Sequence, residues 1–352
     1  MYIVIAIIAF GILIVVHELG HFTAAKLLGV RVNEFAIGMG PKLLKKQGKE
    51  TLYTLRALPF GGFCAMEGED GDSADERSFA AQKRWRRIVI LAAGGLANLL
   101  AGFIIIVVIV SGAKSFGGTT ITDFAEGFPY GGEGGLQVGD TLLKVNGERL
   151  WYREDVLLFL ELSRSPQVDI TLKRGEETIT LERFTIEKHM YMTDGEESLR
   201  YGFSVDLIEA TALEKLKYSF YTAMNYIRLV RVSIAQLING AAGIRDLSGP
   251  VGIVDAMNDI GKRSGSIFGA LVNIADFTAI IGINMAVLNL LPIPALDGGR
   301  IVFIFITWII EKTTRKKLNP KYEGYIHTAV LALLMGLMVF TLVNDVIRIV
   351  NN

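Results

Sequence analysis

The fold of this chain is decided by its first 28 residues, MYIVIAIIAFGILIVVHELGHFTAAKLL. No charged residue precedes Glu18, and the run is longer than the ~20 residues that a helix needs to cross a bilayer. A secretory signal peptide would begin with a positively charged segment, whereas the first basic residue here is Lys26. We therefore predict an uncleaved membrane span that carries two histidines and a glutamate near its end.

Three more apolar stretches follow, and they predict a polytopic α-helical membrane protein with about four transmembrane helices. They run from Ile88 to Gly112, from Ile267 to Leu291 and from Ile326 to Val343. The 51% hydrophobic content excludes a disordered chain, and the single Cys64 excludes an intrachain disulfide framework. The 36 basic residues equal the 36 acidic ones, which argues against a nucleic-acid partner.

The basic residues predict how these spans are oriented. Eleven Lys and Arg residues fall in 29–87, and five more fall in 312–321 after the third span. Short loops rich in Lys and Arg stay in the cytoplasm, so we expect both termini and the long segment before the third span to lie outside it. His17 lies about 24 Å along the first helix at ~1.5 Å per residue, near the cytoplasmic side. We predict a multi-pass plasma-membrane protein.

The extracytoplasmic residues 113–206 predict an inserted β-rich domain. Its short strands are expected at Leu142–Val145, Val168–Leu172 and Thr178–Leu181, separated by glycine turns. The run Gly134–Gly147 resembles the PDZ domains of bacterial envelope proteases, which bind peptides by adding a strand to a sheet edge. The alternative is a β-domain that serves only as a spacer.

A connector, residues 207–265, follows this domain. Apolar residues recur at spacings of three and four over 213–238 with basic residues between them, which predicts an amphipathic helix. Such a helix lies either on a membrane surface or against the neighbouring domain and spans. The pattern leaves both alternatives open.

The chemistry of the chain is indicated by His17-Glu18-Leu19-Gly20-His21. Residues i and i+4 share one face of a helix, so both imidazoles can reach one metal ion. Glu18 can stand beside the ion without binding it and take a proton from water. Ionisable groups inside a membrane are costly, which makes them functional candidates.

A catalytic zinc site needs a third protein ligand and an open fourth position. His327 is possible by its depth at the start of the fourth span, whereas His189 lies in the exported domain. Asp297 is the stronger candidate, because it directly follows the third span, which runs in the same direction as the first. Two prolines end the helix before it, and two glycines after it allow close backbone approach.

The order of these motifs resembles the site-2 protease family, in its bacterial RseP-like branch with a single PDZ domain. The landmarks are His17–His21, the PDZ-like domain, Ser248–Ile253 and Asn289–Arg300. The resemblance implies one zinc ion per chain, held by His17, His21 and Asp297, with Glu18 as the catalytic residue. It also implies substrate contacts at Asn289, Pro292 and Pro294, although Asn289 could equally serve helix–helix hydrogen bonding.

The resemblance further implies a membrane-associated β-hairpin region within 31–66, and Thr51–Leu55 has the composition of a strand. Two positions depart from common relatives: Gly95 replaces a proline, and Arg300 replaces a histidine of some relatives.

The sequence therefore predicts four regions. They are 1–112, with spans one and two, the zinc motif and the hairpin region; 113–206, the PDZ-like domain; 207–265, the connector; and 266–352, with spans three and four.

The predicted function is that of an intramembrane zinc metalloendopeptidase, a hydrolase of regulated intramembrane proteolysis. Its partners would be the bilayer and transmembrane proteins or peptides, such as anti-sigma factors or signal-peptide remnants. The PDZ-like domain would contact substrate ectodomains or their cleaved ends. Two other classes fit less well: a membrane chaperone with a structural metal, which needs no Glu18, and a metal transporter.

Overall fold

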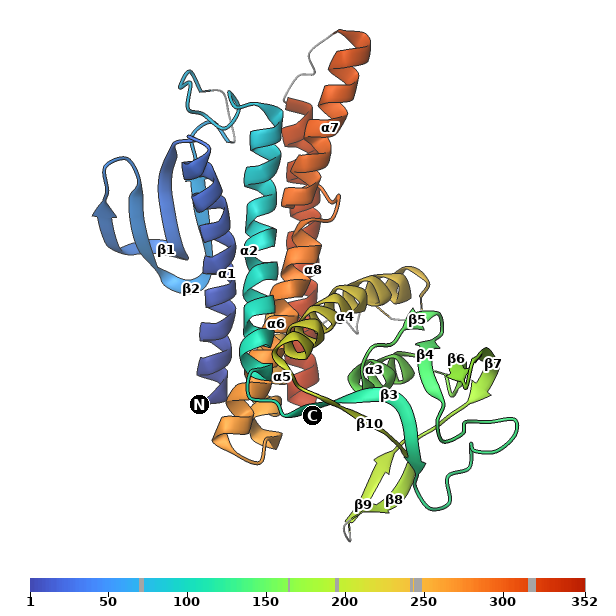
Figure 1. The fold of residues 1–352 in the computed structure, drawn as a ribbon. Helices are drawn as coiled ribbons and strands as arrows, with labels where there is room; N and C mark the ends of the chain where they lie inside the picture. Colours follow the sequence, from blue (N-terminus) through green and yellow to red (C-terminus); the bar gives the residue numbers. More distant parts are fainter. Residues whose placement is uncertain are drawn as a thin grey trace. The chain divides into compact units, whose positions relative to one another are not determined.

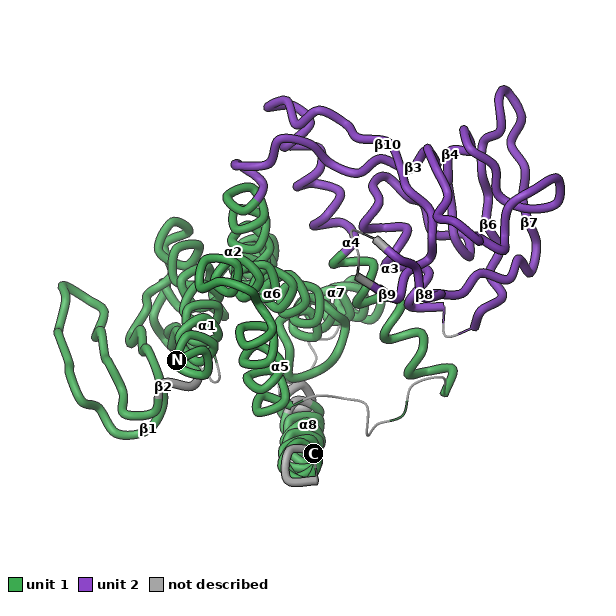
Figure 2. Tube along the Cα trace, turned by 90° about the horizontal axis from the view of Figure 1, so that it is seen from below, with its two compact units in different colours: residues 1–109, 226–352 green, residues 110–225 purple. Residues whose placement is uncertain are grey.

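The computed structural model describes residues 1–69, 73–163, 165–193, 196–240, 243, 249–315 and 321–351. The chain forms two compact units (Figure 2). The first unit contains residues 1–109 and 226–352, and the second contains residues 110–225. Helix α4 (Ala212–Ile238) contributes residues to both units.

Four described helices in the first unit are long and apolar enough to cross a membrane. They are α1 (Tyr2–Leu27), α2 (Arg84–Val110), α6 (Ile267–Asn289) and α8 (Lys321–Asn351), which Figure 1 labels. This confirms the predicted class of a multi-span helical protein with β-sheets. Two shorter helices, α5 (Pro250–Arg263) and α7 (Asp297–Thr314), were not expected from the sequence.

Small residues set the contacts between the spans. A Cβ on Gly20 of α1 would stand 2.3 Å from the Ala93 carbonyl oxygen of α2, and a Cβ on Gly102 would stand 2.7 Å from Ile283 of α6. In lipid, helices gain little from hydrophobic contact with one another, so close packing at small residues drives their association. These glycines therefore bring α1, α2 and α6 close enough to share a site.

The hairpin of β1 (Val32–Gln47) and β2 (Leu52–Met66) lies beside α1 in the first unit (Figure 1). Both strands bend at glycines with positive φ: Gly38 and Gly40 in β1, and Gly61 in β2. Because of these bends, Phe35 pairs with Cys64 on one side and with Tyr53 on the other. Residues 34–37 are thus central, and residues 62–66 form an outer segment of this small sheet.

The second unit is built on a sheet with strand order β10-β3-β4-β6-β7, and β5 pairs with β4. Its elements are β3 (Ser115–Phe124), β4 (Thr141–Val145), β5 (Glu148–Arg149), α3 (Arg153–Leu162), β6 (Gln167–Arg174), β7 (Glu177–Thr185) and β10 (Phe203–Glu209), and a separate hairpin joins β8 (His189–Thr193) to β9 (Glu196–Arg200). The three strands expected from the sequence lie within β4, β6 and β7.

The first half of α4 packs against this β-rich unit. Tyr218 stacks on Phe116 of β3 with ring centroids 4.1 Å apart, and Tyr221 stacks on Trp151 at 4.4 Å. Glu214 accepts a hydrogen bond of 2.6 Å from the Tyr152 hydroxyl. For residues 212–225 the structure thus favours packing on the neighbouring domain over a free membrane-surface helix.

Candidate metal centre

The two histidines of α1 point toward one another near the C-terminal end of this helix. Their Nε2 atoms are 3.2 Å apart, and His21 Nδ1 is 2.9 Å from the Ile90 carbonyl oxygen of α2. A carbonyl oxygen only accepts hydrogen bonds, so Nδ1 of His21 carries the proton and Nε2 presents its lone pair. The hydrogen bond to Ile90 fixes the orientation of the His21 ring, as hydrogen bonds from the second ring nitrogen do for metal-binding histidines in other proteins.

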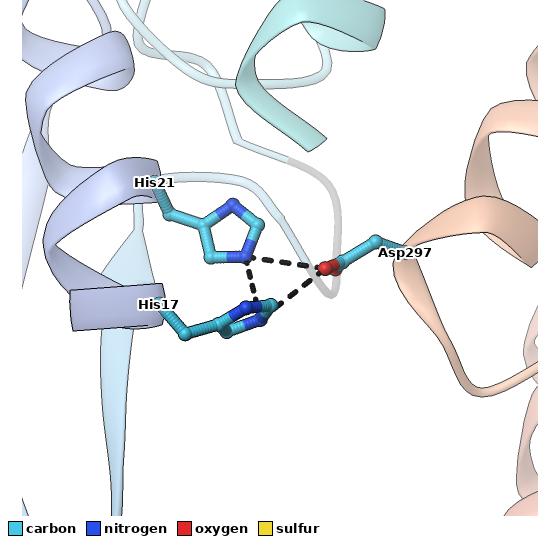
Figure 3. Close-up of side chains that lie close together, drawn as sticks. All are labelled: His17, His21 and Asp297. Atoms are coloured by element: carbon cyan, nitrogen blue, oxygen red, sulfur yellow. Dashed lines mark hydrogen bonds and ion pairs between the residues drawn. The ribbon is translucent and has the colours of Figure 1, made fainter. Parts of the chain in front are cut away.

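Asp297, the first residue of α7, completes a triangle with these nitrogens (Figure 3). Its Oδ2 lies 3.3 Å from His17 Nε2 and 3.3 Å from His21 Nε2. Ligands held at ~2.0–2.1 Å by a tetrahedral zinc ion are about 3.3 Å apart, so the triangle has the size of one face of such a site. The structure thus brings Asp297 beside His17, which lies 280 positions earlier in the sequence.

The donor atoms themselves favour a cation. Asp297 Oδ2 is buried and has no hydrogen-bond partner among the described residues. Asp297 Oδ2 and His21 Nε2 both present lone pairs at a separation of 3.3 Å, and such atoms repel each other unless a positive charge lies between them. Two imidazole nitrogens and one carboxylate oxygen match the ligands of catalytic zinc sites, which keep a fourth position for water.

A cavity of about 390 Å³ opens beside the triangle. It is lined by the three candidate ligands and by Glu18, Phe63, Cys64, Ala65, Met66, Glu69 and Leu91. Glu18 is in this lining without belonging to the triangle, and a Cβ on Gly62 would stand 3.5 Å from its Cγ. Its carboxylate therefore stands next to the candidate metal position as a neighbour of the ligands.

The cysteine in the lining has a different character. Burial raises the pKa of Cys64 to about 12, and the nearby Glu18 and Glu69 carboxylates act in the same direction. Cys64 is also not among the residues whose ligand atoms converge on the candidate metal position, which are His17, His21 and Asp297. Cys64 contributes to the lining of the cavity.

The outer segment of β2 exposes a strand edge to this cavity. Gly62–Met66 pair with β1 along one edge, and no described strand pairs with the other edge. Four consecutive residues of the segment, Phe63 to Met66, line the cavity. An extended peptide could therefore lie alongside this strand next to Glu18.

The remaining sequence candidates lie elsewhere. Asn289 ends α6, and Pro292 and Pro294 lie in the turn that leads to Asp297; the three are absent from the described lining of the cavity. His189 belongs to the second unit, where its Nε2 lies 2.8 Å from the Tyr130 hydroxyl. The side chain of His327 lies outside the described residues.

Three contributors were not anticipated from the sequence: Ile90, Glu69 and Gly94. A Cβ on Gly94 would stand 2.3 Å from His21 Nε2, so a glycine is required under the imidazole rings. The Gly94-Gly95 pair inside an apolar span was a signal of close approach. Nothing in the sequence indicates the roles of the Ile90 carbonyl or of Glu69.

Comparison with known proteins identifies the family of the chain. Residues 5–337 match the model of peptidase family M50. A provisionally named zinc metalloprotease of Clostridium acetobutylicum is 36% identical over 353 residues, covering 99% of this chain and 98% of that protein. The regulator of sigma-W protease RasP of Bacillus subtilis is 27% identical over 431 aligned positions, covering 97% of each chain. The chain therefore belongs to peptidase family M50, the family of the site-2 proteases.

Proposed function

We propose that this protein is an intramembrane zinc endopeptidase that cleaves transmembrane segments of other proteins. The observation that carries the proposal is the triangle of His17 Nε2, His21 Nε2 and Asp297 Oδ2, whose sides of 3.2, 3.3 and 3.3 Å suit one tetrahedral zinc ion. One ion per chain follows from one such triangle. The name of the Clostridium acetobutylicum relative supports the same metal, and the names of the Clostridium and Bacillus subtilis relatives both support a protease reaction.

Each residue has a separate task in this proposal. A zinc ion held by His17, His21 and Asp297 would supply a Lewis acid and would lower the pKa of water in the site. Glu18 would accept a proton from a water molecule as its oxygen attacks the peptide carbonyl carbon, and would donate that proton to the amine nitrogen as the C–N bond breaks. Ile90 and Gly94 hold the imidazoles in place from α2. Asn289 is a weaker candidate for a substrate contact, together with Pro292 and Pro294.

The substrate is a membrane-spanning helix that must first unwind, because helical hydrogen bonds shield its peptide bonds. The unpaired edge of Gly62–Met66 would receive the unwound segment as an added strand. This step explains why a protease for helices carries a β-hairpin next to its candidate metal site. Anti-sigma factors and signal-peptide remnants are substrate classes of this kind, and the name of the Bacillus subtilis relative refers to a sigma factor.

The proposed setting is the plasma membrane, with the termini and the β-rich unit outside the cytoplasm and the site toward the cytoplasmic side. The distribution of Lys and Arg supports this orientation. The second unit would act as a PDZ-like domain that contacts substrate ectodomains or cleaved ends and refuses substrates with large folded ectodomains. Its antiparallel sheet with a helix, α3, supports such a module.

The two rival functions make different predictions. A chaperone with a structural metal would need no carboxylate at position 18, and a transporter would move metal ions across vesicles without cleaving peptides. The purified protein is incubated in detergent with a panel of transmembrane-segment peptides, with chelator, and with chelator followed by zinc. We expect cleavage that the chelator stops and zinc restores. Chelator-resistant cleavage, or zinc flux without cleavage, would overturn the proposal.

A further inference from the structure

One ion pair at the rim of the candidate site has no role in the function described so far. Glu69 lies three residues beyond β2, after a turn at Gly68, whose φ is +63°. It lines the cavity, and it is paired with Arg300 of α7, which is 231 residues away in the sequence. The side chains of Glu69 and Arg300 are only 18% and 21% exposed, so the pair is largely sheltered from solvent.

The two partners belong to the two elements that must meet in catalysis. Glu69 Oε2 accepts a hydrogen bond of 3.4 Å from the Met66 amide, so it is tied to the end of the strand edge that faces the site. Arg300 follows Asp297 by three positions, which places both on one face of α7. The ion pair therefore connects the proposed substrate-binding edge to the helix of the third candidate ligand.

The start of α7 is itself tightly held. A Cβ on Gly298 would stand 2.3 Å from the carbonyl oxygens of Leu290 and Leu291, and one on Gly299 would stand 2.2 Å from the carbonyl oxygen of Ile293. The first turn of α7 is thus packed against the turn before it, and Arg300 extends from a fixed base. The ion pair with Arg300 can therefore position the loop that carries Glu69.

Charge gives Arg300 a second effect. Glu69 is a carboxylate in the wall of a cavity that contains the inward-facing ligand atoms. A carboxylate oxygen is a zinc ligand, and an uncompensated one beside the ion would be drawn toward its open position. The guanidinium of Arg300 neutralises this charge and holds it at the rim.

We propose that the Glu69–Arg300 pair is a positioning device: it sets the strand edge of Gly62–Met66 against Asp297 and keeps the Glu69 carboxylate out of the open metal position. The inference rests on the proposed zinc protease function. It makes Arg300 and Glu69 positioning residues, because neither needs to touch the reacting peptide bond.

The test compares Arg300→Gln, Glu69→Gln and the double variant with wild type and with Arg84→Gln. Arg84 of α2 pairs with Glu311 near the other end of α7. The Arg84→Gln variant therefore also removes an arginine that pairs with a residue of α7, but away from the cavity. The zinc dissociation constant is measured by chelator competition, together with kcat and KM for a transmembrane peptide. Thermal unfolding checks that each variant is folded.

We expect zinc affinity and activity to change in opposite directions in Arg300→Gln. Without the positive charge of Arg300, the Glu69 carboxylate should tighten zinc binding about tenfold and lower kcat/KM about tenfold, since ~1.4 kcal/mol is a modest effect for one partly shielded charge near an ion. Glu69→Gln should weaken zinc binding, and the double variant should return zinc affinity close to wild type, whereas its kcat/KM should stay below wild type because the pair that positions the strand edge is still missing. Arg84→Gln should match wild type in both measurements.

The proposal is overturned if Arg300→Gln binds zinc no tighter than wild type, or if the double variant either binds zinc as tightly as Arg300→Gln or has the kcat/KM of wild type. Both outcomes can be read from zinc affinity and from ratios between variants. Absence of cleavage by the wild type would instead refute the proposed function, and the zinc measurements would still decide whether Arg300 controls the charge of Glu69.

Discussion

Gly94 of α2 lies directly beneath the His21 imidazole of α1: a Cβ at position 94 would stand 2.3 Å from His21 Nε2 and 2.8 Å from His17 Cε1. Distances below 3.0 Å are not tolerated, so a single methyl group must displace at least one ring. The two imidazoles can therefore occupy their positions only because residue 94 has no side chain. This relationship gives a test that leaves every candidate ligand unchanged.

We expect Gly94→Ala to weaken zinc binding by roughly 10- to 100-fold, the usual effect of losing support behind a metal ligand. Zinc content after dialysis against a weak chelator is the measurement. Gly336→Ala is the matched control, because Gly336 is also a glycine of a membrane-spanning helix and a Cβ there has open space. Equal zinc retention in the two variants would contradict the packing described for the site.

The candidate ligand set makes a second prediction. His17→Ala, His21→Ala and Asp297→Asn should each weaken zinc binding by more than the ~100-fold expected for a supporting residue, because each removes a bond to the ion. His189→Ala should retain zinc, since its ring is held by Tyr130 in the other unit. If Asp297→Asn kept its zinc and His327→Ala lost it, the third ligand would be wrongly assigned.

The spans were predictable because a bilayer imposes a length and a composition on each of them. His17, Glu18 and His21 were predictable as a group because helical periodicity fixes their shared face. The beginning of α7 was hidden: Gly298 and Gly299 disfavour helix, yet both lie in its first turn, where close packing against residues 290–293 overrides their propensity.

The tertiary relationships were beyond reach of the sequence. No local pattern pairs Glu69 with Arg300 across 231 positions, or directs the Ile90 carbonyl toward His21. The folded-back register of the hairpin, in which Phe35 has two partners, depends on bends at Gly38, Gly40 and Gly61 rather than on alternation within either strand. Motif spacing thus predicted the candidate ligands, whereas the supporting residues required the structure.

The structure gives a physical explanation for residues 249–253 of the Ser248–Ile253 motif, of which Ser248 lies outside the described residues. Asp345 of α8 is fully buried, and its Oδ2 accepts a hydrogen bond of 2.7 Å from the Gly252 amide at the start of α5. A Cβ on Gly249 or Gly252 would stand 2.8 or 2.7 Å from this carboxylate. Asp345 therefore caps α5 from another helix, where the local cap residue, Gly249, has no side chain.

We expect Asp345→Leu to destabilise the protein by about 1–3 kcal/mol, since it leaves the buried Gly252 amide of α5 without its acceptor. Thermal unfolding of the zinc-loaded protein in detergent measures the effect. Thr328→Val serves as the control in the same helix, because the Thr328 hydroxyl donates a hydrogen bond to the Gly324 carbonyl of α8 itself. An Asp345→Leu protein with the same unfolding temperature as the control would refute the capping role.

The hairpin should respond to acid through Glu34. Burial alone would raise the pKa of Glu34, but hydrogen bonds from Thr54, Arg56 and Lys42 lower it from 4.5 to about 2. The folded state therefore favours the ionised form. Its contribution to stability is fully present above about pH 4.5 and is lost as the pH falls through about 2.

Hydrogen exchange of the β1 and β2 amides, corrected for the intrinsic exchange rate at each pH, measures this contribution. Protection in the wild type should decrease between about pH 4.5 and 2, whereas Glu34→Gln should have lower protection at neutral pH and lack this decrease. Superimposable pH profiles for the two proteins would assign the loss of protection to other groups.

The central claim, a zinc-dependent peptidase in which Glu18 is the base, is tested most directly by Glu18→Gln. The wild type and the variant are purified in parallel, and zinc content and cleavage of one transmembrane peptide are measured on the same samples. The account predicts zinc near one ion per chain in both proteins and a loss of cleavage of roughly 10²- to 10⁴-fold in the variant, the contribution expected of a general acid–base residue. Wild-type turnover by a zinc-loaded Glu18→Gln protein would contradict it.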